Sequence, residues 1–134
     1  MSSIICPTVL ASNPHEYREQ MARIAPFAQR IQIDLMDGEF APSRSVALDR
    51  VWWDDGVQAD IHLMYQRPLE YLGQLIQMRP ALVILHFEAD APHQHMAMEL
   101  QRHGIRAGIA LLKGTPVSAV SGMLPAFDHL LIFS

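Results

Sequence analysis

Four polar residues each stand near the C-terminal end of a short apolar run: Thr8, Asp34, His62 and His86. Burying a carboxylate or an imidazole in such a place is costly unless the group is paired, hydrogen-bonded or bound to a metal ion. Asp34 can act as a general base or can simply cap a loop, and its spacing alone leaves both interpretations open. His62 can bind a metal ion or only pack in the core, and an adjacent Asp34 would favour the first.

These residues belong to a chain in which apolar runs alternate with helical patterns. The apolar runs predict six strands, at residues 3–10, 30–35, 57–63, 81–86, 106–112 and 129–133. Prolines at first helical positions and apolar residues at helical spacing predict five helices, at residues 14–25, 46–52, 68–78, 92–103 and 116–124. The alternation is typical of an α/β fold with a parallel sheet.

The predicted strands are apolar with few alternating polar positions, as in parallel sheets that are covered on both faces. A doubly wound sheet and a (β/α)₈ barrel both fit that pattern. No G-x-G-x-x-G sequence follows Leu10, where a dinucleotide-binding fold would carry it. Barrels place their chemistry at the C-terminal ends of the strands, where the four polar residues are predicted to lie. The sequence therefore favours a barrel.

Several segments resemble the signatures of the ribulose-phosphate 3-epimerase family. The most specific is residues 31–42, IQIDLMDGEFAP, which resembles the family's second strand and the loop that follows it. Four further segments resemble family motifs in the same order: ICPTVLA at 5–11, DIHLM at 60–64, LHFE at 85–88 and GIALLKGTP at 108–116. The resemblance covers essentially the whole chain. It implies an α/β fold, a (β/α)₈ TIM barrel of the ribulose-phosphate-binding type, incomplete here with six strands and five helices.

The resemblance also implies an activity and the residues that perform it. The family moves the proton at C3 of a ketose phosphate, interconverting ribulose 5-phosphate and xylulose 5-phosphate through a metal-steadied enediolate. Asp34 matches the first acid/base and a metal ligand, and His62 matches a second ligand of a divalent ion such as Zn, Fe or Mn. The other implied substrate-binding residues are Thr8, Met36, Met64 and His86, with His62 among them.

The chain departs from the family pattern at two places that matter for chemistry. Gln32 stands where the family has a metal-ligating histidine, so we expect metal binding to be weakened or absent. In the family, the second catalytic aspartate belongs to the seventh strand, whereas this sequence predicts six strands. We therefore expect the 134-residue polypeptide alone to be a poor epimerase.

Six strands leave the first and last strands as open edges, which are prone to aggregation. We expect either that the polypeptide is part of a longer chain, or that a homo-oligomer or another partner covers those edges. Residues 1–134 are interpreted as one partial barrel domain. With a net charge of −4, no basic cluster, no signal-like segment and no long apolar run, the sequence predicts a cytoplasmic protein that binds neither nucleic acid nor membrane.

The residues disfavour two other barrel functions and leave a third alternative open. Barrel decarboxylases and hexulose-phosphate synthases carry D-x-K-x-x-D on a strand, but no lysine follows Asp34. Schiff-base aldolases need a pocket lysine, and the single lysine, Lys113, is predicted to lie on a loop. The third alternative is a catalytically inactive barrel homologue that binds a sugar phosphate or a partner subunit, and Gln32 favours it.

Overall fold

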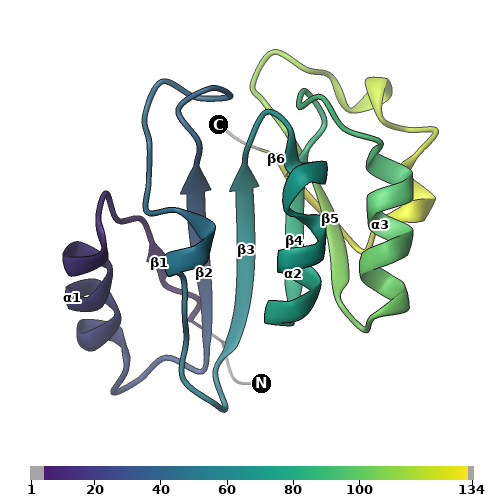
Figure 1. Cartoon of the computed structure of the whole chain (residues 1–134). Coiled ribbons are helices and arrows are strands. Elements are labelled where there is room, and N and C mark those ends of the chain that lie inside the picture. The colour runs from purple at the N-terminus through teal and green to yellow at the C-terminus, as the bar shows by residue number, and fades with distance from the viewer. Residues whose placement is uncertain (1–4, 133–134) are drawn as a thin grey trace.

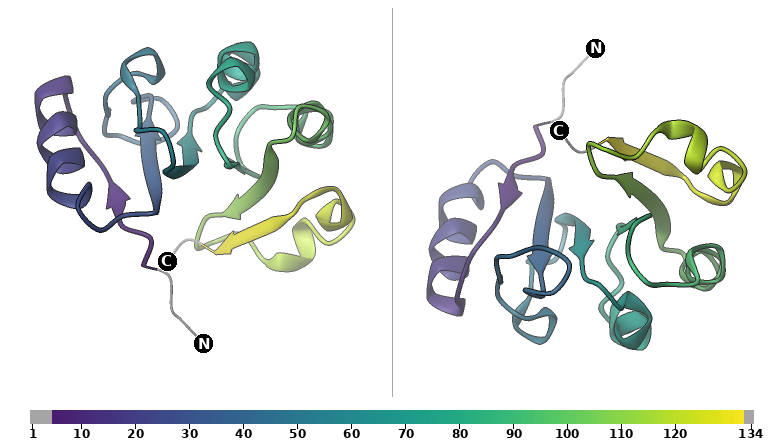
Figure 2. Two further views of the ribbon diagram at one scale, coloured as in Figure 1. Left: turned by 90° about the horizontal axis from the view of Figure 1, so that it is seen from below. Right: turned by 90° about the horizontal axis from the view of Figure 1, so that it is seen from above.

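The computed structural model describes residues 5–132, which form one curved sheet with helices on its convex side (Figures 1 and 2). The strands are β1 (Thr8–Val9), β2 (Arg30–Met36), β3 (Gln58–Met64), β4 (Leu82–His86), β5 (Arg106–Leu111) and β6 (His129–Ile132). All neighbours pair in parallel, in the order β1-β2-β3-β4-β5-β6. This confirms the α/β fold and is consistent with a partial TIM barrel.

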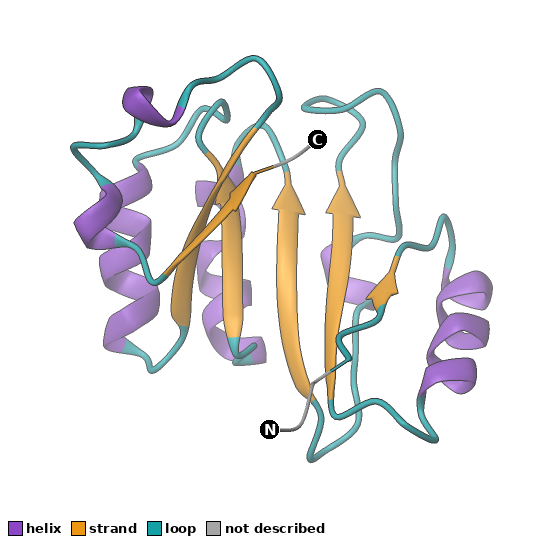
Figure 3. Ribbon diagram, turned by 180° about the vertical axis from the view of Figure 1, so that it is seen from behind, coloured by secondary structure: helices purple, strands orange, loops and turns teal. Residues whose placement is uncertain are grey.

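The three α-helices of the described residues are α1 (Pro14–Ile24), α2 (Leu72–Met78) and α3 (His93–Arg102). In Figure 3, α2 and α3 lie behind the strands, and α1 lies beside β1 at the edge of the sheet. Helix α1 begins as predicted, because the side chain of Asn13 accepts a hydrogen bond of 2.8 Å from the Glu16 backbone N–H. Helix α2 ends at Arg79, which takes a left-handed conformation with φ of 56° before Pro80. None of the helices in the described range is long and apolar enough to cross a membrane.

The prediction of five helices was wrong, because two of them are only 3₁₀ turns within the described residues. Residues 46–52 hold the turn Leu48–Arg50, and Val51 is already extended. Residues 116–124 hold the turn Val117–Ala119, and a second turn, Leu124–Ala126, follows. The second segment combines valines, serines and Gly122, all weak helix formers, and Pro125 disfavours a helical Leu124.

The first strand is shorter than predicted. Strand β1 covers only Thr8 and Val9. Pro7 has no N–H to donate to the sheet, which limits the strand on its N-terminal side. The Pro7 carbonyl still accepts a hydrogen bond from the Gln32 N–H. Residues 3, 4 and 133 of the predicted strands lie outside the described residues.

The two faces of the sheet are built differently. Beneath the helices, alternate residues of β2 to β5 form the main core, which includes Ile31, Ile33, Leu35, Ile61, Leu63, Val83, Leu85 and Ala107. On the concave face, a small apolar cluster of Leu82, Ile84 and Ala110 packs with Leu131. The remaining concave positions at the C-terminal ends of β2, β3 and β4 are polar or methionine.

Candidate active site

Asp34, His62 and His86 form one hydrogen-bonded row across three neighbouring strands. Asp34 is the register partner of His62, and its Oδ1 lies 3.2 Å from His62 Nδ1. His62 Nε2 in turn lies 2.7 Å from His86 Nε2, and the two imidazole rings stack with centroids 4.9 Å apart. Both rings are almost fully buried, at 1% and 0% exposure. The structure therefore brings together three of the residues singled out from the sequence.

Gln32 joins this row from the other side. Its Nε2 donates a hydrogen bond of 2.9 Å to Asp34 Oδ1, the oxygen that also faces His62. Within the described residues, Asp34 Oδ2 accepts no hydrogen bond, and the Asp34 side chain is 15% exposed. The carboxylate is thus held through one oxygen, and no described residue donates a hydrogen bond to the other. Sequence reasoning treated Gln32 only as a lost ligand and missed this contact.

His86 sits between aromatic and acidic neighbours. Burial lowers the pKa of His86 to about 4, and the His62 imidazole acts in the same direction, so His86 is neutral near pH 7. The ring of Phe40 packs at a centroid distance of 4.9 Å, and Glu88 Oε1 lies 3.6 Å from His86 Nδ1. His86 therefore serves the row as a neutral imidazole.

Glu88 is a further acidic residue at this rim. Burial alone would raise its pKa, but hydrogen bonds from the Thr115 side chain and the Leu112 backbone N–H hold that pKa below the ordinary value. The Leu112 bond measures 3.0 Å and ties the loop after β5 to the end of β4. The H-x-E spacing of the sequence was the available signal for this residue, but no role was assigned to it.

Met36 and Met64 are register partners, one step beyond Asp34 and His62 along β2 and β3. Their two thioether side chains follow the polar row toward the C-terminal ends of the strands. Thr8 is further away, because its register partner is Gln32, one step short of Asp34 on the same face. Within residues 5–132, no hydrogen bond joins Thr8 to Asp34, His62 or His86. Among the predicted site residues, Met36 and Met64 thus follow the row along their strands, and Thr8 lies one register step away from it.

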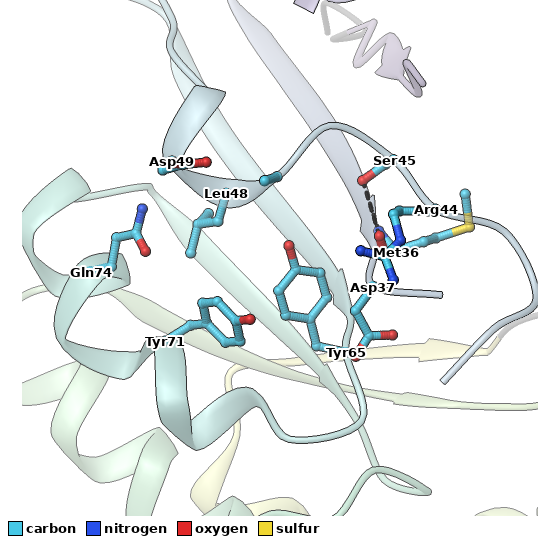
Figure 4. Close-up of a pocket in the computed structure, with 10 residues that line it drawn as sticks. Met36, Asp37, Arg44, Ser45, Leu48, Asp49, Tyr65, Tyr71 and Gln74 are labelled. Atoms are coloured by element: carbon cyan, nitrogen blue, oxygen red, sulfur yellow. Dashed lines mark hydrogen bonds between the residues drawn. The ribbon is translucent and has the colours of Figure 1, made fainter. Parts of the chain in front are cut away.

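A separate cavity of about 380 Å³ lies between the loop after β2 and the start of α2 (Figure 4). Met36, Tyr65 and Tyr71 line it, whereas Asp34, His62 and His86 do not. Its wall is organised by Asp37, whose carboxylate accepts hydrogen bonds from the backbone N–H groups of Glu39, Phe40 and Gln66.

Asp37 is the second carboxylate of the most informative sequence segment, and its surroundings differ from those of Asp34. Burial would raise its pKa, but the backbone N–H donors hold that pKa below the ordinary value. The adjacent Gly38 has φ of 81°, a left-handed conformation that suits glycine. Asp37 therefore shapes the loop that follows β2.

The donor set does not fit a metal centre. Structural and catalytic zinc sites take at least three protein donors, usually from His, Cys, Asp and Glu. In the part of the chain that the structure describes, no three such side chains are grouped to hold a metal ion. Asp34 and His62 supply two donors, and the third neighbour, Gln32, directs an N–H group at Asp34.

Comparison with known proteins gives one consistent family. The profile of the ribulose-phosphate 3 epimerase family matches residues 4–134. A ribulose-phosphate 3-epimerase of Mycobacterium leprae is 30% identical over the whole chain and 61% of its own length. One of Treponema pallidum is 29% identical over 80% of the chain and 50% of its own length, and a chloroplastic ribulose-5-phosphate-3-epimerase of Arabidopsis thaliana is 28% identical over 98% and 49%. The chain thus spans about half to three fifths of these relatives.

Proposed function

The chain belongs to the ribulose-phosphate 3-epimerase family, and from this premise we propose that it supplies one acid/base of a sugar-phosphate 3-epimerase. The proposed substrate is ribulose 5-phosphate, converted to xylulose 5-phosphate, or a close ketose phosphate. One observation carries the proposal: the Asp34 carboxylate is fixed at the C-terminal end of β2 through Oδ1, while Oδ2 accepts no hydrogen bond from the described residues.

The proposed reaction begins with Asp34 Oδ2 as general base. It removes the proton at C3, the C3–H electron pair forms a C2–C3 double bond, and the carbonyl pair moves to the C2 oxygen. Asp34 is then neutral, and the substrate is an enediolate. Because Gln32 and His62 already hold Oδ1, the base is oriented before the substrate binds. This orientation lowers the entropic part of the activation free energy for proton removal.

The other predicted site residues take supporting roles in this proposal. Met36 and Met64 form a thioether wall next to Asp34, which keeps water from the carbanion-like centre. His86 orients His62 through the 2.7 Å contact between their Nε2 atoms. Thr8 contacts the substrate at a greater depth on β1, one register step below Asp34.

Inversion at C3 needs a second acid on the opposite face of the enediolate. Among the described residues, the hydrogen-bonded row holds one carboxylate, Asp34, and the nearby Glu88 is engaged by Thr115 and the Leu112 backbone N–H. A polypeptide of these 134 residues is therefore expected to exchange the C3 proton slowly and to return it to the face from which it came. The activity of the whole protein is part of the proposal, because the chain covers only part of its relatives.

The test is proton exchange in D₂O. Ribulose 5-phosphate is incubated with the 134-residue chain, and deuterium at C3 and formation of xylulose 5-phosphate are followed by NMR. We expect slow deuterium incorporation without appreciable xylulose 5-phosphate, and a loss of at least about 100-fold in Asp34→Asn. Asp55→Asn, at an exposed turn, is the matched control. Exchange that survives in Asp34→Asn would refute the role of Asp34, and epimerisation at ordinary enzyme rates would refute the need for a second acid.

A catalytically inactive barrel homologue is the second candidate, and the incomplete metal donor set favours it. Such a protein would bind ribulose 5-phosphate without exchanging its C3 proton, and calorimetric binding combined with the exchange assay separates the two. The cytoplasmic location, the single partial-barrel domain and the homo-oligomer or covering partner remain predictions.

A further inference from the structure

We infer that Gln32 takes the place of a metal ion at this site by holding Asp34 with an N–H donor, and that the single change Gln32→His would create a metal centre. The inference uses the same residues as the proposed function. The experiment below measures metal binding rather than turnover, so this inference and the proposed function can fail independently.

The first step is the orientation of the Gln32 amide. Gln32 and Asp34 are two residues apart on β2, so their side chains leave the same face of the sheet. The Gln32 nitrogen lies 2.9 Å from Asp34 Oδ1. An ionised carboxylate can only accept hydrogen bonds, so the amide must present its NH₂ group rather than its oxygen. The one atom of Gln32 that could bind a cation therefore points away from Asp34.

The second step concerns His62. Its Nδ1 faces Asp34 Oδ1 at 3.2 Å, and its Nε2 faces His86 Nε2 at 2.7 Å. With Asp34 ionised, the consistent arrangement places a proton on His62 Nδ1 and another on His86 Nε2. The His62 nitrogen nearest to Asp34 then has no lone pair for a metal ion. Two N–H groups thus point at one oxygen of Asp34. They stabilise its negative charge, as a bound cation would otherwise do.

The third step is that the spacing of these groups already suits a metal. Donors bound about 2.0–2.2 Å from a metal ion, at tetrahedral or octahedral angles, lie about 3.0–3.5 Å from one another. The distances from Asp34 Oδ1 to Gln32 Nε2 and His62 Nδ1 are 2.9 and 3.2 Å. An imidazole at position 32 reaches about as far as the glutamine amide and offers a lone pair. Two imidazoles and one carboxylate form a recognised set for Fe(II) and related ions.

The experiment measures metal binding by the tag-free 134-residue chain. Wild type, Gln32→His and the control Gln77→His, on the exposed face of α2, are dialysed against Zn²⁺, and bound metal is counted per chain. Separate metal-free samples receive Co²⁺ instead, and its visible absorption reports a site of low coordination number. We expect about one Zn²⁺ per Gln32→His chain, bound at least tenfold more tightly than by wild type or the control, and a Co²⁺ band in that variant alone.

Stoichiometric tight binding by wild type would overturn the inference, since Gln32 would then not stand in for the metal. Equal binding by Gln32→His and Gln77→His would overturn it as well, since the three positions would not converge. Circular dichroism checks that each variant is folded. If Gln32→His does not fold, Gln32→Glu keeps the side-chain length and supplies a third donor, and the same two outcomes apply to it.

Discussion

The two faces of strands β2, β3 and β4 contrast sharply, although their residues alternate along the same segments. The convex face holds apolar side chains such as Ile33, Leu35 and Leu63, each with 0% exposure beneath the helices. The concave face holds the Gln32–Asp34–His62–His86 row, in which each polar group contacts the next. Because side chains in a strand point alternately to either face, one set can stabilise the fold while the other remains available for chemistry.

The concave face also changes along the strand direction. Toward the N-terminal ends, Arg30 Nε and Nη2 donate hydrogen bonds of 2.8 and 3.1 Å to the Asp60 carboxylate. Toward the C-terminal ends, the carboxylate of Asp34 meets the Gln32 amide and the His62 imidazole instead of a guanidinium. An ion pair fixes the first end, whereas the second end leaves one carboxylate oxygen open. This contrast between a structural end and a reactive end can be tested by substitution.

The largest effect is expected on the convex face. Ile33→Ala removes a fully buried side chain from the main core and should lower the free energy of unfolding by about 2–5 kcal/mol. Urea unfolding followed by circular dichroism measures the change. Ile132→Ala, at a side chain with 62% exposure on β6, is the control and should cost less than about 1 kcal/mol. If both variants lost the same free energy of unfolding, the helix-covered and exposed parts of the sheet would not differ in their contribution to stability.

The second-largest loss of stability is expected on breaking the Arg30–Asp60 ion pair. Arg30→Met leaves the Asp60 carboxylate, whose side chain is 8% exposed, without its bidentate partner, and should cost about 2–4 kcal/mol. Replacing both residues, in Arg30→Met with Asp60→Leu, removes the unpaired charge and should recover much of that loss. Urea midpoints of the single and double variants decide the matter. No recovery in the double variant would mean that the pair acts through packing rather than charge.

The sequence was sufficient to predict the parallel sheet and the placement of its polar residues. Apolar runs of strand length and polar residues at their C-terminal ends follow from rules that are local or periodic. The adjacency of Asp34 and His62 follows as well, because consecutive strands in such folds pair in sequence order. The family resemblance then added roles that spacing alone left open.

Other features depend on contacts that no local pattern encodes. The segment 116–124 begins with Pro116, a helix signal, but serines, valines and Gly122 leave only 3₁₀ turns. The Gln32–Asp34 hydrogen bond depends on side-chain rotamers, so sequence reasoning identified the substitution but not the new contact. The loop role of Asp37 also escapes a local pattern, because one of its backbone donors is the distant Gln66, beside Glu39 and Phe40.

Asp37→Asn should have an intermediate effect that depends on pH. At pH 7 the variant loses the charge on a carboxylate that accepts three backbone hydrogen bonds, and because solvent screens this partly exposed group, it should be less stable by only about 1–2 kcal/mol. The pKa of Asp37 is lower in the folded chain than its ordinary 3.8, so its stabilisation is present above that value and is lost as the pH falls through the folded pKa. Urea unfolding at pH 7 and pH 3 should therefore show the gap to wild type shrinking in acid. A gap that is constant with pH would assign the effect to shape rather than charge.

The smallest effect on stability is expected for Asp34→Asn, the change that should abolish proton exchange. The side-chain oxygen of Asn can still accept from Gln32 and His62, and the variant no longer carries a partly buried charge with one open oxygen. These changes oppose each other, so the free energy of unfolding should shift by less than about 1 kcal/mol. Urea unfolding of Asp34→Asn beside the exposed control Asp55→Asn measures the shift. A loss as large as that of Arg30→Met would show that Asp34 is part of the structural scaffold, and the division between the two ends of the concave face would fail.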